Sequence, residues 1–259
     1  MNWALKNLWA GLKRYNLWSR LALTDIQQIY KRTVFGMSWV AFSFALFVIV
    51  KIVIFGSITS VDTSYFAIWL TLGFWVWTFI IASIVDGCNG FVHARSWILG
   101  TNLPLSIYIY QTSVKCIIRF IFAMPVVICL LIYFHWTPNI NWLWALLGFV
   151  ALVANGLWAQ IFFASVCVKY RDITHLVISF MQVMFFVTPI LYVPEQLGDK
   201  AYLLNYNPFT HFLAVVRDPI IHGTTPMLAW QVVGAFTLIG WMIALLTFQR
   251  MGRHVPFRV

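Results

Sequence analysis

The sequence is poor in charged residues, and poorest in acidic ones. Only 9% of its 259 residues are charged, and 7 Asp and Glu stand against 17 Lys and Arg. A soluble domain carries about 25% charged residues, so most of this chain is expected to lie in lipid. A proton- or ion-coupled carrier usually needs a carboxylate inside the membrane, and the scarcity of acids argues against that class.

Patterns of catalytic or metal-binding residues are missing as well. The acids are scattered, with no DxD pair and no His followed by an acid four or five residues later. The 4 cysteines form no CxxC pair, so neither a metal site nor a disulfide framework is indicated. No Gly-Lys dipeptide occurs, which excludes a P-loop for ATP. We therefore expect no catalytic residue, no metal and no cofactor on this chain.

What the chain has in excess is apolar residues, 62% of the total. They gather in six runs, roughly 38–58, 65–84, 114–134, 142–168, 176–193 and 228–248. Each run is near or above the ~20 residues that a helix needs to cross ~30 Å of hydrocarbon. Helix is required because unpaired backbone groups are too costly in lipid, and the period-two alternation of a barrel is absent. We predict an all-α integral membrane protein with a six-span domain at 38–248.

Positive charge is placed as in a membrane protein rather than a nucleic-acid-binding one. Most Lys and Arg residues lie in segment 1–37, the loop 85–113, the turn 169–175 and the tail 249–259. The connections on the opposite side carry only Lys200 and Arg217, together with four acids. By the positive-inside rule, both termini are expected in the cytoplasm, with membrane lipids as partners and no nucleic acid.

Segment 1–37 is predicted to lie along the cytoplasmic surface of the membrane. Four apolar residues follow the i, i+3, i+4, i+7 spacing of one helix face: Leu5, Leu8, Trp9 and Leu12. A helix packed on the protein, with no role beyond anchoring, is the alternative.

Three cations fall inside the apolar runs. Lys51, Lys115 and Arg119 each lie near an end of a run, so their side chains are expected to snorkel to an interface. We expect no intramembrane carboxylate to pair with them.

Aromatic residues cluster within the runs. They are Trp39 and Phe42 in the first run, Phe74, Trp75 and Trp77 in the second, and Phe185 and Phe186 in the fifth. Flat aromatic faces stack on the C–H faces of sugar rings and tolerate sliding, so these clusters suit a channel for a glycan. The alternative, which composition alone favours, is lipid-facing packing with interfacial Trp belts.

Two cytoplasmic connections have the character of contact surfaces. The stretch 85–106 is long for a connection within a bundle and contains a possible short helix from Gly90 to Ile98. The stretch KYRDITHLV (169–177) is tight and charged. The alternative is a pair of solvated loops.

The stretch NYNPFTHFLAVVRDPIIHG (205–223) is too polar and too broken to span a bilayer. Asn207 is a good N-cap and Pro208 fits the first helical position. A helix is predicted over 208–218, ended by Pro219 and then Gly223, and its eleven residues would cover only ~16 Å. Its apolar stripe contains Phe209, Phe212, Leu213, Val216 and Ile220. With a second short helix at 194–204 it forms a predicted re-entrant pair, and a lid that never moves is the alternative.

Four stretches resemble, in order, segments of the permease subunits of polysaccharide-export ABC transporters, the type-2 exporter family. TDIQQIYKRTVFGMSW (24–39) is similar to the approach to the first span, and KYRDITHLV to the turn between spans four and five. TPILY (188–192) and YNPFTHFLAVVRDPIIHG (206–223) resemble the end of span five and the external segment after it. The resemblance covers essentially the whole chain.

The resemblance implies a permease that forms a homodimer and pairs with two copies of a separate ATP-binding subunit, which would hold ATP and Mg. Such complexes move lipid-linked polysaccharide across the bacterial inner membrane, typically O antigen on undecaprenyl diphosphate. Capsular polysaccharide and teichoic acid are alternative cargoes, and drug-type permeases are a related alternative. A membrane enzyme of glycan or lipid assembly is the alternative from another class.

The resemblance also implies residue roles. The aromatic channel would contain Trp39, Phe42, Phe74, Trp75, Trp77, Phe185, Phe186 and Tyr192. The lipid headgroup would approach Tyr30, Lys31 and Arg32. Coupling to the ATPase would use Asn89, His93, Arg95, Trp97, Arg171 and Asp172. The periplasmic gate would contain Asn207, Pro208, Phe209, Phe212, Leu213 and Arg217.

Three departures from the family pattern affect these roles. Ile29 stands where the family often has an arginine, no proline follows Trp39 before Pro104, and the proline of the coupling loop is displaced, which leaves Pro104 alone. They bear on the headgroup and coupling contacts rather than on the fold.

Overall fold

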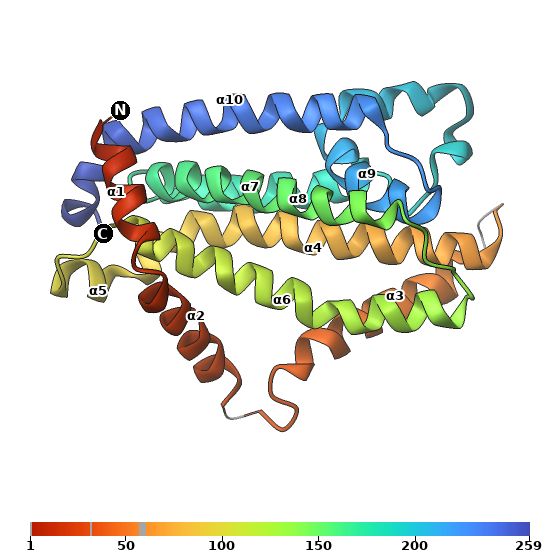
Figure 1. Ribbon diagram of the computed structural model, residues 1–259, viewed down its shortest axis with the longest axis horizontal. Coiled ribbons are helices and arrows are strands. Elements are labelled where there is room, and N and C mark those ends of the chain that lie inside the picture. Colours follow the sequence, from red (N-terminus) through yellow and green to blue (C-terminus); the bar gives the residue numbers. More distant parts are fainter. Residues whose placement is uncertain (1, 32, 57–60) are drawn as a thin grey trace.

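The apolar runs fold into long helices that lie side by side (Figure 1). The computed structural model describes residues 2–31, 33–56 and 61–259, and these contain helices but no strand. Five helices of the described residues are long and apolar enough to cross a membrane. They are α3 (Ser38–Gly56), α4 (Thr63–His93), α6 (Ser106–Tyr133), α7 (Trp142–Cys167) and α10 (Met227–Met251).

The fifth expected span, 176–193, is shorter than predicted. Helix α8 covers Asp172–Val187, and its 16 residues rise only ~24 Å. It ends because Pro189 follows: the residue before a proline avoids helical backbone angles, and Thr188 is extended at φ −85° and ψ 138°. The expected count of six spans is therefore not confirmed.

The connection expected at 85–106 is largely helical. Helix α4 continues to His93, helix α5 covers Arg95–Gly100, and α6 already begins at Ser106. Asp86 and Asn89 look like loop residues in the sequence, yet both find partners within helices: Asp86 pairs with Arg119 of α6, and Asn89 donates to the Val85 carbonyl. The prediction of a loop from residue 85 was wrong for this reason.

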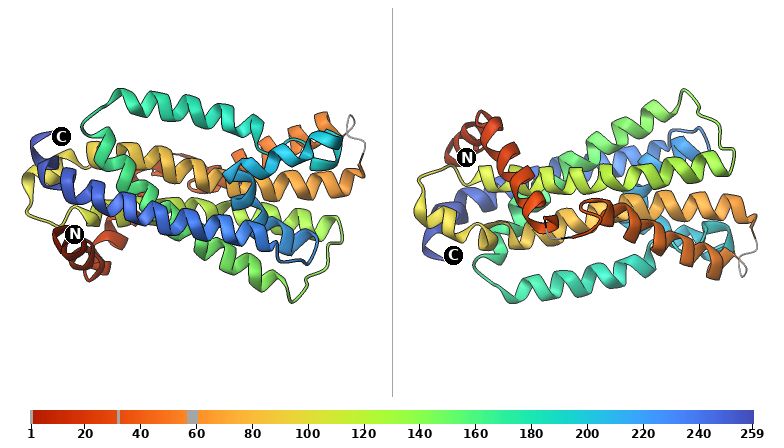
Figure 2. Two further views of the ribbon diagram at one scale, coloured as in Figure 1. Left: turned by 90° about the horizontal axis from the view of Figure 1, so that it is seen from above. Right: turned by 90° about the horizontal axis from the view of Figure 1, so that it is seen from below.

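Helix α4 forms the centre of the bundle and packs against α3, α6, α7, α8 and α9. Its burial rests on close helix contact: a Cβ on Gly87 would lie 2.9 Å from Gln160 Cα of α7. Both views of Figure 2 show α8 running along the side of the bundle, apart from the other long helices over its middle. The buried core is therefore centred on α4, whereas α3 and α8 contribute few buried residues to it.

The N-terminal segment forms two helices, α1 (Asn2–Leu12) and α2 (Tyr15–Tyr30). Helix α1 turns Ala4, Leu8 and Gly11 toward the bundle, where Asn7 accepts two hydrogen bonds from Ser106 at 3.0 and 2.6 Å. Three members of the predicted apolar face remain exposed: Leu5, Trp9 and Leu12. The helix thus packs on the protein with one face and leaves a second apolar face free for lipid.

The segment after α8 forms a 3-10 stretch, η1 (Pro194–Tyr206), and helix α9 (Pro208–Ile221). The predicted cap is confirmed, since the Asn207 side chain accepts from the Phe209 N–H at 3.0 Å. Pro219 does not end the helix as expected. A proline removes the hydrogen bond to the carbonyl four residues earlier, here Val215, and that carbonyl lies directly against Gly148 of α7, where no side chain intervenes. The re-entrant placement in a membrane stays a prediction.

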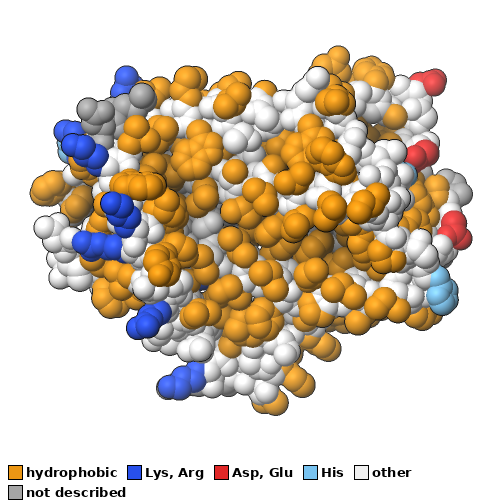
Figure 3. Space-filling view, in the orientation of Figure 1, with side chains coloured by type: hydrophobic (Ala, Val, Ile, Leu, Met, Phe, Trp, Pro, Cys, Tyr) orange, Lys and Arg blue, Asp and Glu red, His pale blue; other side chains and the backbone are white. Residues whose placement is uncertain are grey.

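The two ends of the bundle differ in charge. One end of the bundle, which we call the terminal end, contains both chain termini, helix α5 and the C-terminal stretch η2 (Gly252–Phe257) (Figure 1). Helix α9 and η1 lie toward the opposite end, which we call the far end. On the face in Figure 3, Lys and Arg gather at the terminal end, Asp and Glu gather at the far end, and hydrophobic side chains cover the middle.

Candidate functional site

A groove of 820 Å³ runs along α4 between α3, α6 and α8. It reaches from Phe74 to Asp86, or ~18 Å of helix rise. Its aromatic lining consists of Tyr30, Trp39, Phe44, Phe47, Phe74, Phe79 and Phe120. The groove thus presents rings toward the bundle interior and polar groups at its terminal-end limit.

The rings of the groove are fixed by contacts with one another. The Phe47 and Phe74 rings stack with centroids 3.9 Å apart, and Phe44 stacks on Phe74 at 5.5 Å. Trp75 stacks on Phe120 at 4.0 Å and donates its indole N–H to the Phe120 carbonyl at 2.9 Å. Offset and edge contacts of this kind hold ring orientation, so the lining is a preformed aromatic surface.

Two ion pairs lie at the terminal-end limit of the groove. Arg119 pairs with Asp86 of α4, and Lys115 Nζ lies 3.0 Å from Asp25 Oδ2 of α2. Gln111 also donates to Asp25, at 2.7 Å. Both cations have carboxylate partners that the expectation of no intramembrane carboxylate did not include, because α2 packs on α6 and α4 continues past its expected end.

These pairs line a polar pocket of 310 Å³ between α2, α4 and α6. Tyr30, Asp86 and Arg119 line both the pocket and the groove, so the two adjoin. The pocket brings two cations and two carboxylates together with His93 and Trp97. It can therefore receive a polar or charged group while the groove beside it receives rings or hydrocarbon.

The predicted headgroup residues lie beside this pocket. Tyr30 is half-buried in its wall, and Lys31 is exposed just after α2 ends. Arg32 lies outside the described residues. Lys115 and Arg119, which the sequence reading assigned to snorkelling, are the cations that the structure places in the pocket.

The predicted channel residues divide into three groups. Trp39 and Phe74 line the groove. Trp75 and Trp77 are buried in the core, and Phe185 contacts the Phe74 and Trp77 rings from α8. The remaining three lie elsewhere: Phe42 and Phe186 are exposed, and the Tyr192 hydroxyl donates to the Val187 carbonyl.

The predicted coupling residues gather at the terminal end. Trp97 and Arg95 are exposed on α5, and His93 is exposed at the end of α4. Arg171 and Asp172 are exposed at the start of α8, while Asn89 is half-buried inside α4. These positions leave α5 and the start of α8 available to a partner chain.

The predicted gate residues are mostly core residues. Asn207, Phe212, Leu213 and Arg217 are buried, and Pro208 and Phe209 are half-buried. Helix α9 packs against α4, α7 and α10. A gate built on these side chains would have to move α9 as a unit.

Arg217 is the most enclosed charge of the described residues, with 2% of the residue exposed. Its guanidinium donates to the Pro189 carbonyl at 2.9 Å and lies 3.2 Å from the Trp69 ring centroid. The Trp69 indole N–H donates to the Pro189 and Tyr192 carbonyls at 3.2 and 3.0 Å. Burial lowers the pKa of Arg217 to about 10, so it stays protonated at neutral pH. Arg217 of α9 and Trp69 of α4 thus both bind the backbone that follows α8, and we call this set of contacts the clasp.

Several residues that line the groove were not among the predicted channel residues. Phe44 and Phe47 are three residues apart, the spacing of neighbours on one helix face, which could have indicated them. Phe79 lies two residues after Trp77, and Phe120 lies two residues before Phe122, so their aromatic neighbours in the sequence could have indicated both. Asp25 and Asp86 pair across 90 and 33 residues of sequence, which no local pattern reveals.

Three curated relatives match most of the chain, whereas no family model matches it. Two are O-antigen export system permease proteins RfbA of Klebsiella pneumoniae, 24% identical over 77% of this chain and 78% of the relative, and 23% identical over 85% of each. The third is the protein of that name from Myxococcus xanthus, 20% identical over 84% of this chain and 86% of the relative. The resemblance to polysaccharide-export ABC permeases is confirmed.

Proposed function

We propose that this chain is the channel-forming permease subunit of an ABC transporter that exports lipid-linked polysaccharide across the bacterial inner membrane. Both termini lie in the cytoplasm in this proposal, in keeping with the cations gathered at the terminal end. The relatives are named for O-antigen export, which favours O antigen as the substrate. Its carrier would be undecaprenyl diphosphate.

The observation that carries the proposal is that the aromatic groove adjoins the charged pocket, with Tyr30, Asp86 and Arg119 in the lining of both. A lipid-linked glycan combines sugar rings, a diphosphate and a hydrocarbon chain. Sugar rings can slide along the rings of Phe47 and Phe74, while the diphosphate meets Lys115, Arg119 and the neighbouring Lys31. Because α3 and α8 border the groove at the edge of the bundle, a second copy of the chain would close it into a channel.

The energy source in this proposal is a separate ATP-binding subunit. The chain has no P-loop, so hydrolysis must occur elsewhere. Helix α5, with exposed Trp97, and the exposed Arg171 and Asp172 are the proposed contacts with that subunit. Exposed aromatic and Arg side chains are typical anchors of protein interfaces.

Purification of the chain with its ATP-binding partner subunit tests the proposal. In proteoliposomes, lipid-linked O antigen should stimulate ATP hydrolysis, and a P-loop Lys→Ala variant of the ATPase should remove the stimulated rate. Capsular polysaccharide and teichoic acid on the same carrier are the parallel arms. Stimulation by one of these alone would reassign the substrate, and no stimulation by any glycan would overturn the export proposal.

A further inference from the structure

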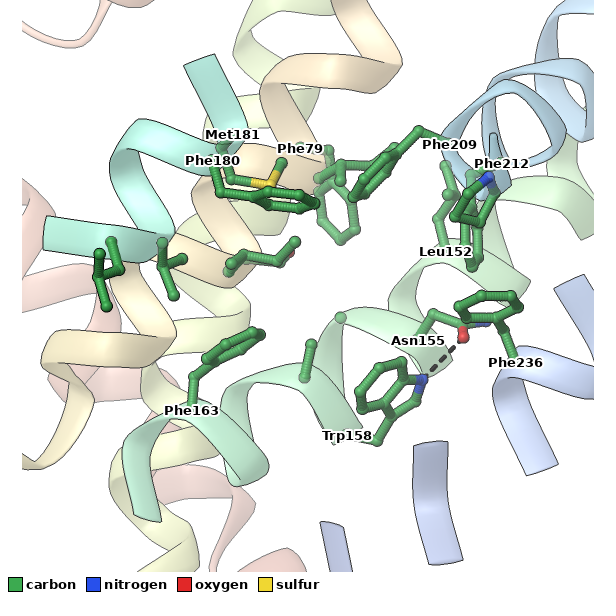
Figure 4. Close-up of a pocket in the computed structure, with 18 residues that line it drawn as sticks. Phe79, Leu152, Asn155, Trp158, Phe163, Phe180, Met181, Phe209, Phe212 and Phe236 are labelled. Atoms are coloured by element: carbon green, nitrogen blue, oxygen red, sulfur yellow. Dashed lines mark hydrogen bonds between the residues drawn. The ribbon is translucent and has the colours of Figure 1, made fainter. Parts of the chain in front are cut away.

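A second cavity lies on the other side of α8 from the groove. It has a volume of 410 Å³ and is enclosed by α4, α7, α8, α9 and α10. Figure 4 shows side chains that include Phe79, Phe180, Phe209 and Trp158 arranged around an open space. Phe79 lines both this cavity and the groove, so it forms part of the wall between them.

The lining of this cavity offers almost no hydrogen bonds to a ligand. The Asn155 amide donates to the Ala151 carbonyl and to the Thr237 hydroxyl, both at 2.8 Å. The Trp158 indole N–H donates to Asn155 Oδ1 at 2.7 Å, as the dashed line in Figure 4 marks. Within the part of the chain that the structure describes, Ser83 Oγ is the one polar lining atom without a partner. The ligand that fits this chemistry is hydrocarbon.

The surroundings of the cavity supply hydrocarbon rather than water. Helices α4, α7 and α10 are all long and apolar enough to span a bilayer, and the cavity lies between them. Its rim includes Leu176 and Phe180 of α8, which are 68% and 53% exposed. Left empty, a space this large would deprive its walls of van der Waals contacts that close-packed interiors normally make.

We propose that this cavity binds one acyl chain of a bilayer phospholipid, inserted beneath α8. If a methylene group takes roughly the space of a water in the liquid, about 30 Å³, the cavity holds on the order of ten methylenes. That matches part of a single acyl chain and is far too small for a whole undecaprenyl chain. The site goes beyond the proposed export function and does not depend on its substrate.

Such a chain would have a structural consequence for α8. Helix α8 packs against α4 and has one buried residue, Met181, while Leu176, Phe180, Val183 and Phe186 are exposed. The bound chain would fill the space that protein side chains leave between α8 and α7. A lipid would thus complete the packing of a short helix whose own protein contacts are few.

Photo-cross-linking tests the site directly. The full chain is reconstituted in vesicles of phosphatidylethanolamine and phosphatidylglycerol that contain a phosphatidylethanolamine with a diazirine near the end of one acyl chain. We expect labels on inward residues such as Leu152, Phe163 and Met181, located by mass spectrometry of peptides. Labels confined to outward residues such as Val183 and Phe186 would overturn the proposal.

Matched variants on one helix make the result specific. Val177→Phe places a ring where Val177 lines the cavity, and should abolish the inward labels. Val183→Phe adds the same ring at an exposed position of α8 and should leave them unchanged. Leu176→Phe at the rim provides a second blocking variant if Val177→Phe fails to fold. Equal inward labelling in blocking and control variants would contradict acyl-chain binding in the cavity.

A competing probe separates the two possible hydrocarbon sources. A diazirine-bearing polyprenyl diphosphate is added to the same vesicles at equal concentration. Labelling of Leu152 and Met181 by the phospholipid, undiminished by the polyprenyl probe, supports the assignment. Displacement of the phospholipid label by the polyprenyl probe would overturn it in favour of the carrier lipid. Cross-links from these residues to a second copy of the chain would overturn it in favour of a protein occupant.

Discussion

Helices α3 and α4 are adjacent, similarly apolar and differently placed. Their most apolar windows have mean hydropathies of 2.4 and 2.0, yet 11% of the α3 window and 67% of the α4 window are buried. Hydropathy identifies a helix that prefers hydrocarbon, and lipid and protein interior satisfy that preference equally. The difference lies in the small and hydrogen-bonding residues of α4, such as Gly73, Gly87 and Trp75, which permit close approach and bonds to neighbours.

The contrast extends to the rest of the molecule. Helix α9 shares the buried character of α4, α8 shares the exposed character of α3, and α7 is intermediate, with 39% of its most apolar window buried. In the proposed homodimer, the exposed faces of α3 and α8 are surfaces that a second copy could cover. Stability should therefore depend on the central region, and assembly on the peripheral one.

Replacing Arg217 with Ala should have the largest effect on stability. The change removes the hydrogen bond to the Pro189 carbonyl and the contact with the Trp69 ring, and it leaves a cavity in the clasp. We expect a loss of about 3 kcal/mol or more in the free energy of unfolding. Thermal unfolding in detergent micelles measures it.

Two further variants sharpen that measurement. Arg217→Lys keeps the charge but loses the planar donor set, and should recover only part of the loss. Arg253 also lies over a ring, that of Trp3 at 5.7 Å, but its side chain is exposed. Arg253→Ala should therefore change stability by less than about 0.5 kcal/mol. Equal losses of unfolding free energy for Arg217→Ala and Arg253→Ala would contradict the view that stability depends on the central region.

Replacing Gly148 with Ala should have the next largest effect. The added methyl group would collide with the Val215 carbonyl of α9, a backbone group that cannot rotate away. We expect overpacking to cost about 1–3 kcal/mol, measured by the same thermal unfolding. Gly234→Ala on α10 is the control, because no described atom lies within 4 Å of its added Cβ.

The outcome at Gly234 is itself informative. Alanine favours helix by about 1 kcal/mol over glycine, so Gly234→Ala should be neutral or stabilising. If Gly148→Ala proved equally harmless, α7 and α9 would not be in backbone contact. The accommodation of Pro219 inside α9 would then need another explanation.

Much of this fold could be predicted from the sequence, and the successes share a physical basis. The approximate positions of the long helices follow from runs of apolar residues, and the cap at Asn207 from its Asn-Pro step. The end of α8 could also be predicted from the sequence, because Pro189 keeps the residue before it out of the helical conformation. These signals are local, since each depends on a few consecutive residues.

The candidate site was predicted less well because its contacts are not local. Nothing in the neighbourhood of Lys115 indicates that Asp25, on another helix, will pair with it. Likewise Trp39 and Trp75 are equivalent in a composition argument, yet one lines the groove and the other is buried on Phe120. Which face of an apolar helix meets protein depends on partners that a single span does not specify.

The pair of Asp25 and Lys115 lies between the centre and the periphery, and its loss should have a smaller effect. Its side chains are 37% and 20% exposed, so solvent weakens the attraction. Asp25→Ala, which also loses the Gln111 bond, should cost about 1 kcal/mol. The consequence should be local, as faster proteolysis within α2 while the central helices remain protected.

A double-mutant cycle isolates the pair. If Asp25 and Lys115 act together, the costs of Asp25→Ala and Lys115→Ala should add to more than the cost of the double variant. Strict additivity would mean that the two charges do not stabilise the docking of α2 on α6. The charge-swapped variant Asp25→Lys with Lys115→Asp should restore part of the protection.

The smallest effect is expected on the exposed face of α3. Val53 is 69% exposed, whereas Val48 on the same helix is fully buried, so the two residues compare identical chemistry at two depths of packing. Val53→Ala should change the unfolding free energy of the isolated chain by less than about 0.5 kcal/mol. Val48→Ala should cost about 2 kcal/mol because it opens a cavity against the core.

Protein concentration then separates lipid contact from contact between copies at Val53. In excess detergent, where the chain is diluted among micelles, the Val53→Ala variant should match the parent protein. A cost that emerges only at concentrations where copies associate would place Val53 between copies. A cost equal to that of Val48→Ala at every concentration would contradict the peripheral position of α3, because a lipid-facing valine has no protein neighbours to lose.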